Sequence, residues 1–372
     1  QRMDYTPVSI TEAIANLKLD RLEGIFKRIK NQDIVMFNVQ FANLLSSGLT
    51  ITTSLNTLQM QNENKKMSEV ISGVYHSVEA GESLSVSLSK YPEVFTNLFI
   101  SMVKSAEIGG DLAGVLNRYA EFSESQTEMQ RKIKEALFYP VILIVAAIGV
   151  TVFMATFLIP KFVEIFNQTG IDLPLPTVIL YCVGMAIRNF WYLIILAVVL
   201  IVFGIKKYLK TESGKLKFDT LILKLPMLGP ILRKIFISRF ARTLATLIGG
   251  GVPILESLHT VREVVNNKVF DQTIKHVSKS VEKGVSLAES LHISGEFPAD
   301  AVQMVSVGEE SGNLAKMLNK ISDFYDRSTD YNIKRMVTSL EPILLVVMGV
   351  IVAFTMASMF FPMFDMAKVL KR

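Results

Sequence analysis

The chain has 372 residues, of which 50% are hydrophobic and only 20% are charged, and its formal net charge is +5. A mean hydropathy of +0.38 is too high for a purely soluble protein, and so modest a charge does not indicate a nucleic-acid partner. Cys182 is the only cysteine, which excludes a disulfide within the chain and a cysteine-based metal cluster.

The N-terminal segment, residues 1–33, is mixed and charged and lacks the apolar core of a signal peptide. Apolar residues then recur at helical spacing, and we expect Asp33 to cap this helix and Gly48 to end it. The apolar stripe consists of Ile34, Phe37, Phe41, Leu44 and Leu45. No strand pattern of useful length occurs, so residues 34–138 are predicted to form a small all-α bundle.

Three stretches are apolar enough to cross a bilayer, which requires about 20 residues in helical form. Residues 141–159 and 343–361 carry no charge, and the middle stretch is interrupted only by Arg188 and Asn189. We therefore predict three transmembrane helices, at 139–160, 178–205 and 339–362. Residues 190–205 form the core of the middle helix, whereas 178–187 can belong either to the span or to the interface.

The cationic residues beside these stretches predict the orientation of the chain. They precede the first span and follow the second, at Arg131, Lys132, Lys134, Lys206, Lys207 and Lys210. By the positive-inside rule, domain 34–138 and domain 206–338 are cytoplasmic. The loop 161–177 and the tail 363–372 are then periplasmic. The tail carries three cations of its own, but the alternation of spans requires it to lie outside.

The sequence repeats itself at an offset of 203 residues that becomes 202 after one deletion. Gly-x-x-Ile occurs at 48–51 and 251–254, and Glu-x-Gly-x-Ser-Leu at 79–84 and 282–287. Glu-x-[Gly/Ser]-Gly-[Asp/Asn]-Leu occurs at 107–112 and 309–314. Each repeat is thus a helical bundle followed by an outer span, and the middle span returns the chain to the cytoplasm between them. The predicted fold is an all-α membrane protein with two homologous cytoplasmic bundles.

The third motif has two interpretations, a phosphate-binding loop and a joint between helices. It lacks the lysine and the preceding strand of a Walker loop. We favour a joint, in which the glycine ends one helix in the left-handed conformation and the next residue caps the following helix. The joint residues are Glu107, Gly110, Asp111, Glu309, Gly312 and Asn313.

Small residues recur at a spacing of four in both outer spans. They are Ala147, Thr151 and Ala155 in the first span and Gly349, Ala353 and Ala357 in the last. Such faces allow close helix approach in lipid, although small residues are common in membrane helices by chance. We expect these faces to pack against each other or between subunits.

The two cytoplasmic domains differ in charge. Residues 34–138 hold 8 Lys/Arg and 11 Asp/Glu, whereas residues 211–338 hold 17 and 14. Four cations crowd the start of the second domain, Arg233, Lys234, Arg239 and Arg242. Lipid headgroups can account for the first two, and an acidic partner surface, including the first domain of another subunit, is the alternative for all four.

No catalytic or metal-binding motif accompanies these features. The four histidines are scattered, and we find no Walker motif, dinucleotide fingerprint or nucleophile elbow. The chain is therefore not expected to be an enzyme or to hold a cofactor.

Together the duplicated motifs and the three spans resemble the inner-membrane platform family shared by type IV pilus assembly and type II secretion. The resemblance covers about residues 33–364, and residues 132–140 and 166–176 are more similar to the pilus branch. It implies a longer N-terminal segment than 1–33, which we therefore expect to be incomplete.

The resemblance implies a multi-pass protein of the bacterial inner membrane that couples a cytoplasmic hexameric motor ATPase to the insertion or extraction of pilin or pseudopilin. It also implies other inner-membrane assembly proteins and a second copy of the chain, as a dimer or trimer, as partners. A platform of type II secretion is the alternative. A secondary transporter with parallel repeats is a distant one, since it needs more spans and polar groups near mid-bilayer.

Overall fold

The computed structural model describes residues 29–169 and 175–369, in which all regular structure is helical. The predicted all-α fold class is thereby confirmed. The chain divides into two compact units. The first contains the residues up to Met129 together with Ile235–Asp326, and the second contains Gln130–Lys234 and the residues from Arg327 onward.

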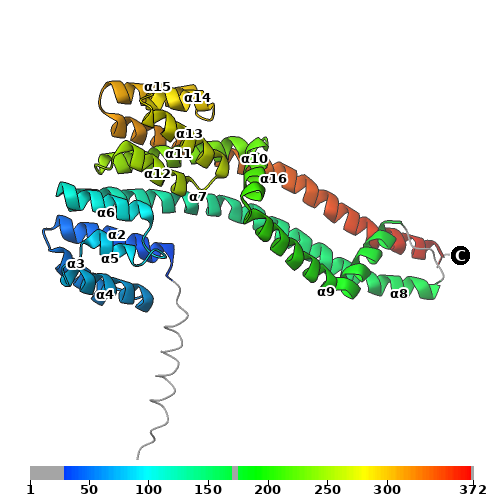
Figure 1. Ribbon diagram of the computed structural model, residues 1–372. Coiled ribbons are helices and arrows are strands. Elements are labelled where there is room, and N and C mark those ends of the chain that lie inside the picture. Colours follow the sequence, from blue (N-terminus) through cyan, green and yellow to red (C-terminus); the bar gives the residue numbers. More distant parts are fainter. Residues whose placement is uncertain (1–28, 170–174, 370–372) are drawn as a thin grey trace, which may run out of the picture. The chain divides into compact units, whose positions relative to one another are not determined.

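The first helical bundle occupies the N-terminal part of the first unit (Figure 1). Its helices are α2 (Asn31–Ser46), α3 (Ile51–Gln61), α4 (Lys65–Glu79), α5 (Leu84–Ser89), α6 (Asn97–Gly109) and the first part of α7 (Leu112–Phe153). Its core is aromatic. Phe37 of α2 pairs with Phe41 and with Phe95, and Phe95 pairs with Phe99, with ring centroids 5.5–5.7 Å apart. All four rings are buried.

The start of α2 differs from the prediction. Lys30 is the N-cap, and the carboxylate of Asp33 lies within the first turn, where it accepts a hydrogen bond from the backbone N–H of Lys30 at 3.0 Å. An acidic residue at this position satisfies a free amide from inside the helix instead of from the cap. Gly48 ends the helix as expected, with φ of +87° and a hydrogen bond from Leu49 N to Leu44 O.

The second bundle repeats the first, helix for helix. It consists of α11 (Leu228–Gly249), α12 (Ile254–Val265), α13 (Lys268–Glu282), α14 (Leu287–Ser294), α15 (Ala299–Glu310) and the first part of α16 (Leu314–Val369). Phe240, Phe270 and Phe297 form its aromatic core, with centroid distances of 4.9 and 6.0 Å from Phe297 to the other two.

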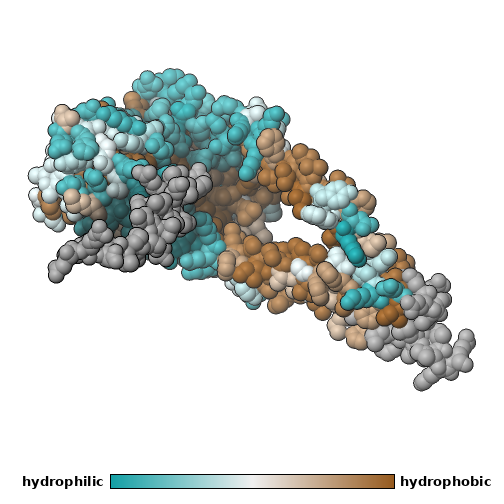
Figure 2. All heavy atoms as spheres, turned by 90° about the horizontal axis from the view of Figure 1, so that it is seen from below, coloured by the Kyte–Doolittle hydropathy of each residue, from teal (hydrophilic) through white to brown (hydrophobic). Residues whose placement is uncertain are grey.

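Among the described residues, three helices are long and apolar enough to cross a membrane, within Leu112–Ile165, Leu175–Leu209 and Leu314–Ser358. Figure 2 shows hydrophobic residues gathered along the second unit, which carries these stretches. In the first and the last of them, the closing helix of a bundle runs on into the apolar stretch. Neither junction contains a helix-ending glycine, and the helices continue through Pro140 and Pro342, the proline at the start of each apolar stretch.

The middle apolar helix, α9 (Leu175–Leu209), includes residues 178–187 and is interrupted at Phe190, whose φ and ψ are −118° and 18°. This interruption directly follows the polar pair Arg188 and Asn189. The remaining elements of the second unit are the π-helix η1 (Met154–Leu158), α8 (Ile159–Thr169) and α10 (Glu212–Lys224).

Two segments expected to be irregular contain helix. Most of the predicted loop 161–177 belongs to α8 and the start of α9, and residues 170–174 lie outside the described residues. The predicted tail from 363 is helical up to Val369, and 370–372 also lie outside the described residues. Of the N-terminal segment 1–33, only residues 29–33 are described.

Candidate functional site

The repeated joint motif connects α6 to α7 and α15 to α16. Gly110 has φ of +79° and donates from its N–H to the carbonyl of Ala106 at 2.8 Å, and Gly312 has φ of +68°. Both glycines take the left-handed conformation, which other residues adopt only with strain. Asp111 caps α7, because its Oδ1 accepts from the N–H of Gly114 at 3.0 Å.

Asn313, the counterpart of Asp111, behaves differently. Its amide Nδ2 donates to the carbonyl of Ser311 at 2.9 Å, while its own backbone carbonyl accepts from Met317 N at 3.1 Å. An amide can donate where a carboxylate can only accept. The second joint is therefore held by a contact back to α15, and it lacks the negative charge of the first.

The glutamate of each motif caps the N-terminus of the preceding short helix, not that of the long helix that follows the motif. The carboxylate of Glu107 accepts from Leu84 N at 2.5 Å and from Ser85 N at 3.3 Å, at the start of α5. In the second bundle Glu309 accepts from Leu287 N at 2.7 Å and from Ala288 N at 2.8 Å, at the start of α14. A carboxylate satisfies the free amides there and interacts favourably with the helix dipole.

These glutamate contacts join the second and third repeated motifs in space, a role that the sequence analysis missed. The Ser-Leu that ends the second motif begins α5 in one bundle and α14 in the other. The signal was present, since the two motifs recur together in both repeats. A repeated acidic residue paired with a repeated helix start indicates long-range capping.

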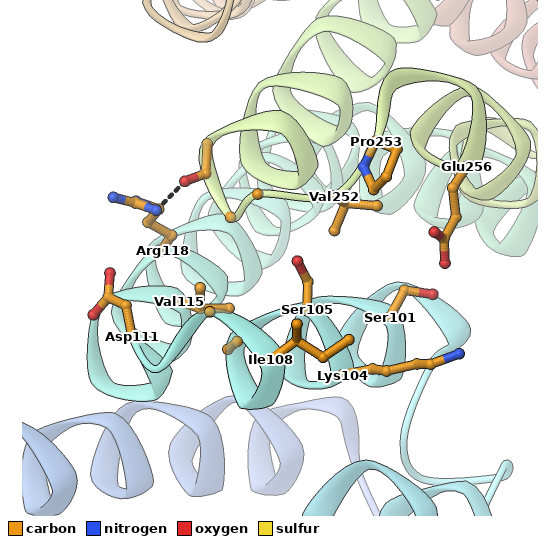
Figure 3. A pocket seen from close by; sticks show the side chains of 15 residues that line it. Ser101, Lys104, Ser105, Ile108, Asp111, Val115, Arg118, Val252, Pro253 and Glu256 are labelled. Carbon is orange, nitrogen blue, oxygen red and sulfur yellow. Dashed lines mark hydrogen bonds between the residues drawn. The ribbon is translucent and has the colours of Figure 1, made fainter.

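A cleft of about 670 Å³ lies between the first joint and the turn from α11 to α12, inside the first unit. Figure 3 shows Ser101 and Ser105 of α6 facing Val252 and Glu256 across it. The Arg118 guanidinium donates to the carbonyl oxygen of Gly249, at the end of α11. A cation is favoured there because helix C-termini carry partial negative charge.

The cleft has a mixed chemical character. Its charged lining residues are Lys104, Asp111, Arg118 and Glu256, two of each sign, and they are accompanied by serines and glycines. No group of three His, Cys, Asp or Glu residues that could hold a metal occurs among the described residues. The arrangement suits a contact surface between helical bundles better than a reaction centre.

Three of the four cations at the start of the second bundle, Lys234, Arg239 and Arg242, make hydrogen bonds or ion pairs within the chain, and the acidic-partner surface stays a prediction. Arg242 pairs with Asp323 at 2.8 Å and with Asp326 at 2.7 Å, both on α16, and its side chain is only 20% exposed. Lys234 donates to Ser328 Oγ at 2.8 Å. These side chains attach α11 to α16.

Arg239 is also used inside the bundle. Its guanidinium donates to the carbonyl of Val265, the last residue of α12, at 3.3 Å. Burial lowers the pKa of Arg239 below its ordinary value, yet an arginine remains protonated at neutral pH. Arg233 is half-buried and also has a partner. The cluster therefore contributes to the fold, because the acids that it meets come from α16, far along the chain.

Of the small residues of the first outer span, Ala155 packs against the middle span. Ala147 and Ala155 are buried, and Thr151 donates to the carbonyl of Ala147 at 2.9 Å. A Cβ added to Gly184 of α9 would lie 2.0 Å from the carbonyl oxygen of Ala155. Ala155 therefore packs closely on α9, while pairing of the small-residue faces with each other or between subunits stays a prediction.

The last outer span presents its small face differently. Gly349 and Ala353 are exposed, Ala357 is half-buried, and a Cβ added to Gly349 would meet nothing within 4 Å. The contact between α9 and α16 is instead polar, because Thr177 donates to the carbonyl of Ser358 at 2.7 Å.

A sequence model of the family described as type II secretion system (T2SS), protein F, matches residues 37–160 and 240–362. The chain belongs to this family. Each match covers one bundle together with the outer span that follows it, which agrees with the internal repeat. The resemblance drawn from the motifs is confirmed.

Relatives from both branches of the family align with most of the chain. The type IV pilus assembly protein PilC of Thermus thermophilus is 35% identical over 337 residues, 90% of this chain and 82% of the relative. PilC of Myxococcus xanthus is 32% identical over 342 residues, 92% and 82% respectively. The type II secretion system protein F of Vibrio cholerae is 29% identical over 374 residues, 100% and 92%.

Proposed function

We propose that this family member is a non-enzymatic assembly platform of a type IV pilus machine in the bacterial inner membrane. In this role it couples a cytoplasmic hexameric motor ATPase to the insertion or extraction of pilin, together with other inner-membrane assembly proteins and further copies of itself. The names of the pilus-assembly relatives, at up to 35% identity, support the pilus branch.

The observation that carries this proposal is the continuity of the helices. Helix α7 runs for 42 residues and α16 for 56, each from a bundle into an apolar stretch. Each of these helices contains a proline, Pro140 or Pro342, that lacks a backbone donor, but neither helix ends there. A displacement of the bundle by a motor would therefore reach the lipid-embedded segment without a loop to absorb it.

The charge pattern supports the orientation that this mechanism requires. Arg131, Lys132 and Lys134 precede the first apolar stretch and Lys206, Lys207 and Lys210 follow the second. Cations favour the cytoplasmic side. Both bundles then face the cytoplasm, where a motor ATPase has access to them, and the segment around 161–177 is periplasmic.

The second candidate is the platform of a type II secretion system, which would act on pseudopilins. It is favoured by the Vibrio cholerae relative, whose alignment covers the whole of this chain. The same helix continuity would serve either machine. A host strain that lacks its own platform distinguishes the two, since the chain should restore surface pili in one case and protein export in the other.

Helix continuity can be tested in the full chain with a proline at Gln130, an exposed position of α7. Helix α7 already contains Pro140, and a second proline at Gln130 removes a further hydrogen bond nearer the bundle, at a cost of about 3 kcal/mol. The variant Gln130→Pro should still enter the membrane and co-purify with the motor ATPase but should lose piliation. The matched variant Gln130→Ala keeps the helix and should retain piliation.

Two outcomes would count against the proposal. Normal piliation with Gln130→Pro would show that the continuous helix is not needed to transmit motion. Failure of the wild-type chain in detergent or nanodiscs to retain any motor ATPase would argue against the coupling itself. A parallel variant at the equivalent position of α16, Asn332→Pro, tests whether both helices are required.

A further inference from the structure

The two bundles contact each other head to tail within the first unit. Helix α6 and the start of α7 in the first bundle face α11 and α12 in the second. Asn97 of α6 donates to the carboxylate of Glu263 of α12 at 2.8 Å, and Arg118 of α7 donates to Gly249. Met102 Cε lies 3.7 Å from the position of a Cβ added to Gly250.

Because the chain is duplicated, each half of this contact exists a second time. The counterparts of α6 and α7 are α15 and α16, and the counterparts of α11 and α12 are α2 and α3. In Figure 1, α3 and α15 lie on opposite sides of the unit, away from the contact between the bundles. Helices α3 and α15 are not among the helix pairs that contact each other substantially inside the chain. A head-to-tail contact between repeats leaves one tail and one head without a partner.

Equivalent residues differ in exposure as this geometry requires. Val252, which lines the cleft, is 4% exposed, whereas Leu49 at the same position of the first repeat is 37% exposed. Phe122 lies one turn beyond Arg118 on the same face of α7 and is 6% exposed. Its counterpart Phe324 is 55% exposed.

The unpaired halves are also chemically matched to each other. Asn97 corresponds to Ala299 in the second repeat, and Glu263 corresponds to Met60 in the first. The hydrogen-bonded polar pair within the chain therefore has an apolar pair as its counterpart on the two unpaired surfaces. Met60 is 77% exposed. Burying so large an apolar side chain against another removes its surface from water, which is favourable.

The cation at the contact also has a basic counterpart in the second repeat. Arg118, which donates to the end of α11, corresponds to Lys320 of α16, and Gly249 corresponds to Ser46, the last residue of α2. Lys320 is exposed, and the last turn of α2 contains no basic residue of its own. A lysine from another chain would therefore meet an uncompensated helix C-terminus.

We propose that a second copy of this chain docks its α2–α3 corner onto the α15–α16 surface of the first, reproducing between chains the contact that joins the two bundles within a chain. The interface is heterologous, so copies add in one direction and form a closed ring when the rotation between them closes. This proposal rests on the self-association included in the proposed function, but not on the motor or the pilin.

Cross-linking in membranes tests the proposal with the full chain in a Cys182→Ser background. Met60→Cys and Ala299→Cys are introduced on separately tagged chains, which are co-expressed and treated with a short bismaleimide. A head-to-tail interface yields a mixed dimer from the two chains and no product from either alone. Both substitutions on one chain should yield a ladder of larger products.

Two controls bracket this experiment. Asn97→Cys with Glu263→Cys on one chain should cross-link internally, because those side chains already meet at 2.8 Å. Met60→Cys combined with Ile293→Cys on α14 should give no mixed dimer. Ile293 is 72% exposed but lies outside the equivalent surface.

The outcomes separate this proposal from self-association in general. Oligomers in nanodiscs by mass measurement, without the mixed cross-link, would mean that chains associate through another surface, which overturns this inference alone. Cross-linking of Met60→Cys to itself would indicate a two-fold interface and would also overturn it. A chain that remains monomeric in the bilayer would refute self-association as a whole.

A second measurement transplants the internal pair into the interface. Met60→Glu alone should weaken association by about tenfold, since it leaves an unpaired charge at the contact. Adding Ala299→Asn recreates the Asn97–Glu263 pair and should bring the dissociation constant back to within about threefold. Equal weakening in the single and double variants contradicts the proposed pairing.

Discussion

Glu309 and Leu287 lie 22 residues apart, near the end of α15 and at the start of α14, yet the carboxylate of the first accepts the backbone N–H of the second at 2.7 Å. The same contact joins Glu107 to Leu84 in the first bundle. The two repeats have therefore kept not only their helices but also the long-range hydrogen bond that fixes the short helix in each bundle.

Substituting this glutamate should destabilise the second bundle. Glu309→Ala leaves the amides of Leu287 and Ala288 without their carboxylate, and loss of such a capping contact costs about 1–2 kcal/mol. The unfolding temperature of the full chain in nanodiscs measures the effect. Glu310→Ala is the matched control, because Glu310 is exposed and bonds only to Ser306 one turn away. Equal losses in the two variants would contradict the capping role.

Gly184 should not tolerate a side chain. Gly184→Ala places a methyl group 2.0 Å from the carbonyl of Ala155, so η1 or α9 must move. We expect destabilisation of about 1–3 kcal/mol, the usual range for overpacking. Gly204→Ala on the same helix meets nothing within 4 Å, and the added methyl group should be neutral or slightly favourable there. Unfolding of both variants in the same nanodisc preparation checks the difference.

Removing the side chain of Arg242 in α11 should destabilise the fold. Arg242→Ala removes two ion pairs, and the carboxylate of Asp326, which is less exposed than Asp323, is the more costly to leave unpaired. A double-mutant cycle should give a larger coupling energy with Asp326→Ala than with Asp323→Ala. Coupling of the same size in both cycles would show that burial does not set the strength of these pairs.

The two small-residue faces should respond differently to bulk. Ala155→Leu must disturb the packing on Gly184 and should lower the unfolding temperature of the isolated chain, since Ala155 is 1% exposed. Ala353→Leu should leave that temperature unchanged, because Ala353 is exposed. Loss of piliation with Ala353→Leu and unchanged stability would identify this face as a contact with another protein in the membrane. Normal piliation would remove that role.

Periodicity, charge and repetition in the sequence were sufficient to predict the fold class, the repeat and the three apolar helices. These properties depend on residues that are close together in the sequence, through their spacing along one helix or the length of an apolar run. Gly48 was predicted correctly for the same reason, because a left-handed residue ends a helix wherever it stands.

Contacts between distant segments could not be predicted in the same way. The ion pairs of Arg242 with Asp323 and Asp326 were not predicted, because these acids lie more than 80 residues away and only the fold brings α16 beside α11. Asp33 was predicted to be the N-cap of α2, but it lies three residues after the cap, Lys30. The sequence does not distinguish the two positions, since an acidic residue satisfies free amides either as a cap or within the first turn. The close approach of Ala155 to Gly184 was likewise not predicted, because it joins two different apolar helices.

The length of α7 has a mechanical consequence. At a rise of 1.5 Å per residue, its 42 residues extend for about 63 Å. Pro140 lies inside this length, and a proline leaves one backbone hydrogen bond of the helix unmade, so the helix bends most readily there. In the proposed platform role, motion passed along α7 would cross this point immediately before the apolar stretch.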